Sequence, residues 1–158
     1  EVRGGKYTVE GSVALEAPHE LVFGLLLDYE ASERVYRNIL GSRVEEGGRG
    51  KVLVQQCQWQ FLVFKGEFEA SFDVEEGDNE VTFALNQEGF MRDFTGYWRV
   101  EPASEGCCRV FHRMTVLPSL APPPPIQFYT RKIFRRQVEA ILEDLAEGVE
   151  GRKRALAQ

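Results

Sequence analysis

Few side chains in this sequence could carry out acid–base, nucleophilic or metal chemistry, because its 158 residues include only two histidines and three cysteines. His112 lies where apolar and polar residues alternate, on the face of Val110 and Met114 and opposite Arg109 and Arg113. On that face it could hydrogen-bond a ligand carbonyl or exchange a proton with a substrate. It could also be a core histidine whose hydrogen bonds are satisfied within the protein, and its isolation favours this second interpretation.

General acid–base catalysis would need a second polar group aimed at the same point as His112. Gln56 and Gln58 share a strand face with two valines that could be buried, and Arg92 precedes the next predicted strand. These three side chains and His112 are the only polar constellation that the pattern allows. Because it has no carboxylate and no nucleophile beside an activating base, we expect no catalytic residue.

The cysteines and histidines do not form a metal-binding pattern. Cys57 is isolated, Cys107 and Cys108 are adjacent, and His19 follows a proline at a predicted helix start. None of these spacings is typical of zinc ligands, so we expect no metal and no cofactor. An odd number of cysteines without a disulfide framework fits a soluble protein of a reducing intracellular compartment.

The charge and hydropathy of the chain exclude two classes of partner or location. A formal net charge of −6 repels the phosphate backbone of nucleic acids, so a nucleic-acid partner is not expected. No apolar run approaches the roughly 18 residues of a membrane-spanning helix. We therefore expect a globular domain that neither spans a bilayer nor binds nucleic acid.

The elements that position these residues follow from the periodicity of the sequence. Residues 6–16 alternate as a strand that ends at Ala17-Pro18, and helical spacing then predicts two short helices up to Tyr36. From residue 43 to 117 the period is two, with turns at 46–48, 76–79 and 104–106. Beyond the breaker at 121–125, apolar residues recur at helical spacing from Phe134 to Val149.

This order of elements predicts one α+β domain over residues 1–158, with its core between about residues 6 and 150. We expect a helix-grip fold, in which a curved antiparallel sheet of about seven strands surrounds the long C-terminal helix. Two short helices would follow the first strand. Where the long helix stands away from the sheet, a hydrophobic cavity would remain.

Large apolar side chains lie on the predicted inward faces and could line such a cavity. The alternation places Phe64, Phe72 and their neighbours on one face, with Gly66, Ala70 and Gly96 leaving space beside the rings. The alternative is that these side chains simply fill the core. The predicted ligand-binding residues are Phe68, Phe83, Phe94, Trp98, His112, Met114, Phe134 and Val138.

A basic and apolar segment follows the prolines at 122–125 and stands out in an acidic chain. It could contact an anionic membrane surface while a lipid enters or leaves, because each basic residue contributes about 1 kcal/mol near acidic headgroups. The alternative is a stiff loop and the solvated first turns of a helix. The predicted membrane-contact residues are Ile126, Phe128, Arg131, Lys132 and Arg135.

Two segments, VFGLLLDYE at 22–30 and FTGYWRVEP at 94–102, together with the order of elements, resemble the polyketide cyclase/dehydrase and lipid-transport group of the START-like (SRPBCC) superfamily. The resemblance covers residues 7–147. Within that group the chain is most similar to the coenzyme-Q-binding branch and its plastid and cyanobacterial relatives, which also carry a proline after the last strand, as at Leu117-Pro118. These relatives imply a chloroplast location.

The resemblance and the inward residues together favour a non-catalytic carrier or chaperone of a lipid, an isoprenoid quinone or a pigment. One alternative is a cyclase or dehydratase that uses His112. Another is a protein-interaction module whose cavity is filled. In the carrier, the ligand would lie between the sheet and the last helix, with the short helices and nearby loops as its gate.

Overall fold

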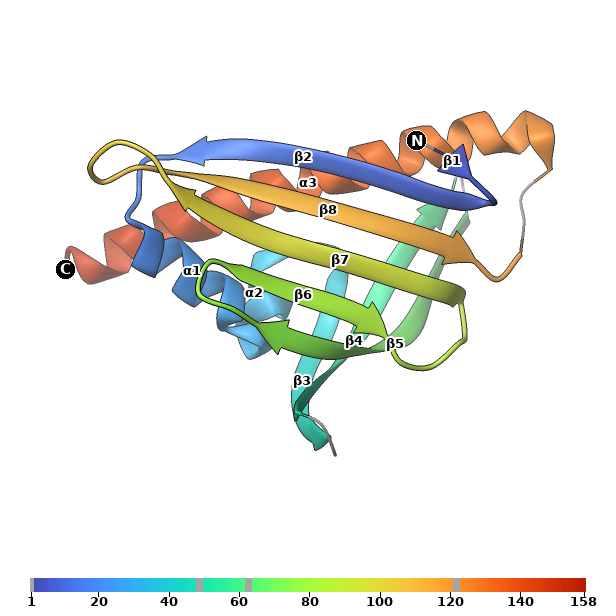
Figure 1. Ribbon diagram of the computed structural model, residues 1–158, viewed down its shortest axis with the longest axis horizontal. Coiled ribbons are helices and arrows are strands. Elements are labelled where there is room, and N and C mark those ends of the chain that lie inside the picture. Colours follow the sequence, from blue (N-terminus) through green and yellow to red (C-terminus); the bar gives the residue numbers. More distant parts are fainter. Residues whose placement is uncertain (1, 48–49, 62–63, 121–122) are drawn as a thin grey trace.

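An eight-stranded antiparallel sheet and one long helix make up most of the protein (Figure 1). The computed structural model describes residues 2–47, 50–61, 64–120 and 123–158. The strands are β1 (Val2–Arg3), β2 (Lys6–Leu15), β3 (Ile39–Gly47), β4 (Gly50–Phe61), β5 (Phe64–Glu76), β6 (Glu80–Leu85), β7 (Met91–Pro102) and β8 (Cys108–Pro118). The helices are α1 (His19–Leu27), the 3-10 turn η1 (Tyr29–Ala31), α2 (Ser32–Val35) and α3 (Pro124–Leu156).

The predicted α+β helix-grip architecture is confirmed. Seven long strands are present, and the two-residue β1, which the sequence did not predict, adds a short edge beside β2. The long helix begins inside the predicted breaker, at Pro124. Prolines are compatible with the first helical turn because the N–H groups that they lack have no acceptor there. Residues 121–122 of that breaker lie outside the described residues.

The strand order is β1-β2-β8-β7-β6-β5-β4-β3, with every neighbouring pair antiparallel. One row of Cα partners runs Gly11, His112, Trp98 and Val81 from β2 to β6. Since side chains alternate along each strand, this register identifies the face that is turned toward the helices, called the inner face below. On β5 the predicted buried face is confirmed from Ala70 to Val74, whereas Phe64 is 62% exposed.

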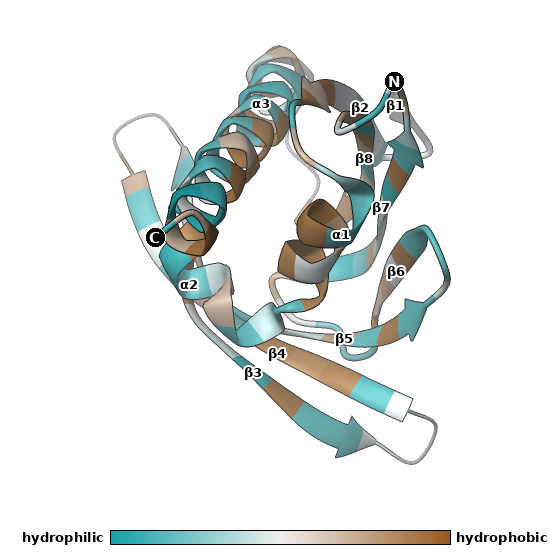
Figure 2. Ribbon diagram, turned by 90° about the vertical axis from the view of Figure 1, so that its left-hand side faces the viewer, coloured by the Kyte–Doolittle hydropathy of each residue, from teal (hydrophilic) through white to brown (hydrophobic). Residues whose placement is uncertain are grey.

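The long helix packs chiefly against β2, α1 and α2. A Cβ atom on Gly11 would lie 2.9 Å from Cδ1 of Leu142 and 3.3 Å from Cγ1 of Val138, so the glycine lets α3 lie directly on β2. Viewed nearly along α3, the sheet curves around α1 and one side of α3 (Figure 2). No helix in the described ranges is long and apolar enough to cross a bilayer.

Helix α1 covers one end of the inner face, where it packs against β7 and α3. Its side chains Val22, Phe23, Leu25 and Leu26 are all buried. They join a core cluster that includes Trp98 of β7 and Leu145 of α3. The hydrophobic core is therefore concentrated at the α1 end of the grip, and the opposite end is where we find the candidate site.

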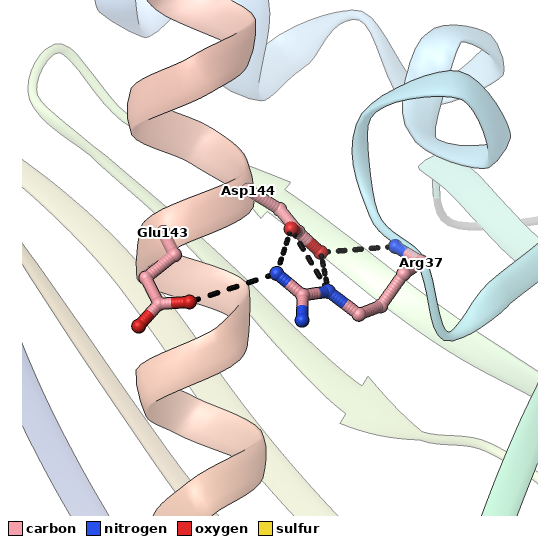
Figure 3. A network of polar contacts seen from close by, with 3 residues as sticks. All are labelled: Arg37, Glu143 and Asp144. Atoms are coloured by element: carbon pink, nitrogen blue, oxygen red, sulfur yellow. Dashed lines mark hydrogen bonds and ion pairs between the residues drawn. The ribbon is translucent and has the colours of Figure 1, made fainter.

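An ion pair between the exposed Arg37 and the buried Asp144 fixes the segment after α2 to the long helix (Figure 3). Arg37 donates from Nη2 to Oδ1 of Asp144 at 2.6 Å and from Nε at 3.0 Å, and its backbone N–H donates to Oδ2 at 3.0 Å. Glu143 lies farther from the guanidinium, at 3.6 Å. The Asp144 side chain is only 7% exposed, so its carboxylate depends on Arg37 for compensation.

Replacing Arg37 by Gln should lower the free energy of unfolding, because it leaves the buried Asp144 carboxylate without its charged donor. The loss should be smaller than that for a fully buried pair, since the Arg37 side chain is 61% exposed. Urea unfolding of Arg37→Gln, Asp144→Asn and the double variant would measure the effect. The double variant should be more stable than Arg37→Gln alone, and strictly additive losses would show that the pair is not coupled.

Candidate functional site

All eight predicted ligand-binding residues lie between the sheet and the helices. The register places Phe68, Phe83, Phe94, Trp98, His112 and Met114 on the inner face. On α3, Val138 lies above Gly11, and the Phe134 ring is 5.4 Å from that of Tyr7 on β2. The structure thus brings these residues to one side of the sheet, and their contact with a ligand stays a prediction.

The burial of these eight residues divides them into two groups. Trp98, Met114 and Val138 are 7%, 3% and 2% exposed and belong to the packed core, and His112, also 7% exposed, is buried beside Trp98. Four aromatic rings are only partly buried although they face inward, and these are Phe68, Phe83, Phe94 and Phe134. The second group therefore offers apolar surface that the protein itself does not fully cover.

His112 has a well-defined hydrogen-bonding state. Its Nδ1 lies 3.0 Å from the carbonyl oxygen of Tyr97, and its ring stacks on Trp98 with centroids 4.1 Å apart. Burial lowers the pKa of His112 to about 4, against a smaller opposite effect of the Tyr97 bond. Because a carbonyl only accepts, we assign the proton to Nδ1, which leaves Nε2 as an acceptor. As an acceptor this nitrogen is matched to a hydroxyl and not to a carbonyl, and His112 lines neither of the two hollows described below.

The predicted polar constellation around His112 does not form. Gln56 and Gln58 lie on the outer face, opposite Glu69 and Glu67, and Gln56 hydrogen-bonds Glu69. Arg92 is exposed on β7 rather than in a loop. The prediction that the glutamines face inward was wrong because Val54, on their face of β4, is buried on the outer side of the sheet.

Three aromatic rings cover the inner face at the end opposite α1. Phe90, from the β6–β7 loop, stacks on Phe68 with centroids 4.5 Å apart and on Trp59 at 5.8 Å. The Trp59 indole lies over Gly66, where a Cβ atom would come within 2.5 Å of the ring. Phe90 is still 50% exposed, so it lies between the inner face and solvent. We call Trp59, Phe68 and Phe90 the aromatic mouth.

Sequence reasoning missed Trp59 and Phe90 as site residues. Phe90 follows Glu88-Gly89 in a loop, where no periodicity indicates which way a side chain points. Trp59 lies directly opposite Gly66 in the β4–β5 register. A large ring opposite a glycine across a hairpin indicates that the ring lies over the glycine, but this signal can be used only when the strand register is known.

A hollow of about 180 Å³ opens beside the aromatic mouth. The pairing of β5 with β6 ends at Phe72 and Leu85, and the β6–β7 loop spans the gap beyond. The lining includes Phe68 and Ala70 from the inner side of β5 and Glu69 and Ser71 from its outer side. The hollow thus reaches the inner face through an interruption of the sheet.

A second hollow, of about 480 Å³, lies on the outer face over β5 to β8. Its lining combines threonines with charged residues, namely Thr82, Thr95, Thr115, Asp73, Glu75 and Arg113 among others. No α3 residue lines either of these two hollows. Phe83 also belongs to the lining of the second hollow. We take the first as the candidate site because it adjoins both Phe68 and the exposed ring of Phe90.

The predicted membrane-contact residues lie in the first turns of α3. Phe128 is 66% exposed, and Arg131, Lys132 and Arg135 are exposed as well. Ile126 is half-buried, so it is less available than predicted. The exposed members leave this helix face open to a partner, and which partner contacts it stays a prediction.

The state of His112 predicts a specific loss of stability in acid. Its pKa is about 4 in the folded protein and 6.5 for an unperturbed histidine in the unfolded chain, so the unfolded chain binds the proton first as the pH falls. Stability from the neutral ring is complete above pH 6.5 and is lost as the pH falls toward 4, by about 3 kcal/mol in total. Urea unfolding at several pH values should show this slope, and His112→Asn should remove it. An unchanged slope in the variant would contradict the assignment.

Comparison with known proteins gives one family and a group of similar structures. The model of the family described as polyketide cyclase/dehydrase and lipid transport matches residues 15–145. No curated protein sequence matches the chain. The Zhui aromatase/cyclase from Streptomyces sp. R1128 is similar in structure, with a TM-score of 0.77 and 16% identity over 96% of this chain and 98% of that one.

Two further structures share the fold. A START superfamily protein from Mycobacterium smegmatis has a TM-score of 0.75 and 18% identity, over 92% of this chain and 98% of its own. A STAR-related lipid transfer protein fragment from Xanthomonas axonopodis has a TM-score of 0.66 and 14% identity, over 95% of this chain and 96% of its own. Because the family model covers most of the sequence, the chain belongs to the polyketide cyclase/dehydrase and lipid transport family of START-like proteins.

Proposed function

We propose that this protein binds and transfers a hydrophobic small molecule without changing it chemically. The observation that carries the proposal is the hollow beside the aromatic mouth, which leads to inward rings that the protein leaves partly uncovered. The family includes lipid-transport proteins, and one similar structure is a STAR-related lipid transfer protein. The ligand class that suits such a surface is a lipid, an isoprenoid quinone or a pigment.

Entry of the ligand would require Phe90 to move. The hollow of about 180 Å³ is smaller than the roughly 300–1,000 Å³ of ordinary ligand pockets. The Phe90 side chain is held by its two ring contacts, each of which contributes about 0.5–1.5 kcal/mol beyond burial, while the backbone of its loop is bonded to Ser119. The ring can therefore turn away at modest cost, after which the ligand would replace Phe90 against Phe68 and continue along the inner face toward Phe94.

Burial of apolar ligand surface would supply the affinity, at about 25 cal/mol per Å² before ordering costs. A coenzyme-Q-like ligand and a chloroplast location stay predictions of the sequence resemblance.

Native mass spectrometry after incubation with a total membrane lipid extract should show a one-to-one adduct. Phe94→Leu should weaken the adduct because it removes a ring from the inner face. Phe111→Leu is the matched control, since Phe111 lies on the outer face of β8, under the guanidinium of Arg99. Equal adducts in the two variants would contradict an inner-face site, and a bare parent protein that captures a protein partner would favour the interaction module.

A cyclase or dehydratase is the second candidate, because the family includes such enzymes and the Zhui aromatase/cyclase shares the fold. His112 is the residue that would have to act. With a pKa near 4 it is unprotonated at neutral pH, so it is a weak general base and unsuited to act as a general acid. The geometry therefore supports the carrier better than the enzyme.

The enzymatic candidate is tested by incubating the protein with a poly-β-ketone substrate and following cyclised product. We expect the product to form no faster than in buffer. Turnover that is lost in His112→Asn, with the unfolding free energy unchanged at neutral pH, would overturn the carrier proposal.

A further inference from the structure

Exposed apolar side chains gather at one end of the molecule. Of the seven large hydrophobic residues that the described ranges leave exposed, five lie at this end and only Leu40 and Leu156 lie elsewhere. The five come from four segments of the chain, namely Phe64 at the start of β5, Phe90 in the β6–β7 loop, Leu120 after β8, and Phe128 and Tyr129 on α3. We call these five residues the apolar end.

Hydrogen bonds and ring contacts join these segments. The backbone N–H of Ser119 donates to the carbonyl of Phe90 at 3.3 Å, and the Ser119 hydroxyl donates to the carbonyl of Gly89. Phe90 in turn stacks on Trp59 and Phe68 of the β4–β5 hairpin. Figure 1 shows the β6–β7 loop, the end of β8 and the start of α3 at the same right-hand end. Contacts therefore join the Leu120 segment, the Phe90 loop and the β4–β5 hairpin, and the start of α3 lies at the same end of the molecule.

The first turns of α3 project beyond the sheet. The ring contact of Phe134 with Tyr7 ties the helix to the start of β2, and the helix extends ten residues on the N-terminal side of Phe134. In Figure 1 these orange turns reach to the right of β2. Phe128 and Tyr129 lie on this projection, 66% and 52% exposed. Such a protruding apolar end suits a soft, extended surface rather than a concave pocket of a protein.

The charges near the apolar end are suited to an anionic surface. The chain has a net charge of −6, yet residues 106–138 contain no Asp or Glu. Four exposed cations follow Phe128 on α3, namely Arg131, Lys132, Arg135 and Arg136. The ion pairs found within the described ranges involve none of these four side chains.

The spacing along α3 matches the layers of a bilayer interface. At 1.5 Å per residue, Lys132 and Arg135 lie about 6 and 10 Å behind Phe128 along the helix. An apolar group buried about 5–10 Å into the headgroup boundary would leave these cations among the headgroups. Their long side chains can adjust to keep the charge there.

Carboxylates also lie near this region, among them Glu67 and Glu69 on the outer face of β5, Glu88 and Asp93. Asp93 is paired with Lys6 at 3.2 Å, which offsets its charge. Glu88 is exposed in the same loop as Phe90, so its charge should repel an anionic surface. Removing this charge should therefore strengthen binding, whereas removing a cation should weaken it.

We propose that the apolar end docks on the surface of a bilayer that contains anionic lipids, with Leu120, Phe90 and Phe128 inserted and the α3 cations at the headgroups. This deepens the proposed function, on which it rests, by naming the partner from which a carrier would take its ligand. Docking brings the aromatic mouth to the membrane, since Phe90 belongs to both regions.

Flotation with vesicles of phosphatidylcholine, with or without phosphatidylglycerol, tests the proposal on the whole chain. The protein should bind the anionic vesicles at least about tenfold more tightly, and added salt should weaken binding. Replacing Arg131, Lys132 and Arg135 together by Gln should reduce binding roughly 10- to 100-fold. Leu120→Ser with Phe128→Ser should reduce it by about tenfold or more, whereas Glu88→Gln should strengthen it.

The other end of α3 provides a matched control. Leu156 is 72% exposed and Arg154 is exposed, so Leu156→Ser with Arg154→Gln alters the same kinds of side chain far from the apolar end. This variant should bind like the parent. Trp59 reports contact independently, because brominated lipid should quench its fluorescence and Trp59→Phe should lose most of that quenching, since Trp98 is only 7% exposed.

Failure to bind anionic vesicles, or an equal loss in the Leu156/Arg154 control, would overturn the docking proposal. Uptake of ligand in the absence of vesicles, measured by native mass spectrometry on the Arg131/Lys132/Arg135 variant, separates this result from the proposed function. A protein that takes up ligand but ignores vesicles retains the carrier function and loses the docking site. A protein that binds vesicles but takes up no ligand retains the docking site and loses the carrier function.

Discussion

The close packing of α3 on β2 is the constraint on which the rest of the structure depends. Gly11 has no side chain to hold the helix away, so Val138 and Leu142 approach the strand directly. A helix that leans on one side of the sheet cannot also cover the far strands. The inner face of β5 to β7 must therefore be covered by something else, and at each end of the grip the protein uses a different element.

At one end the cover is α1, whose buried apolar residues complete the core. Polar contacts hold the following segment, through Arg37 on Asp144 and through the Tyr29 hydroxyl, which donates to Glu76 at 2.7 Å. At the other end the outermost cover is the ring of Phe90, which a short loop carries and which stacks on Phe68 and Trp59. The first end has many contacts to break and the second has few, so opening is easier at the aromatic mouth than at the short helices that sequence reasoning expected to form the gate.

The sequence predicted the architecture well because period-two and helical spacings are strong, local signals. Phe68, Phe94 and Met114 were placed on the correct face by alternation alone. Gln56 and Gln58 were misplaced because alternation does not tell which of two half-apolar faces is inward, and Val54 is buried on the outer side. Phe90 and the pairing of Arg37 with Asp144, 107 residues apart, depend on tertiary contacts that carry no local pattern.

Phe90 connects the binding site with the proposed docking surface. In water its exposed ring is best placed against Trp59 and Phe68, where stacking removes part of it from solvent. At a bilayer the same ring can be buried in the lipid instead, so leaving the stack no longer exposes it to water. Since Ser119 ties the Phe90 loop to Leu120, insertion of that leucine would draw the loop along. Docking would thus favour opening at the place where a ligand could leave the membrane, with no separate switch.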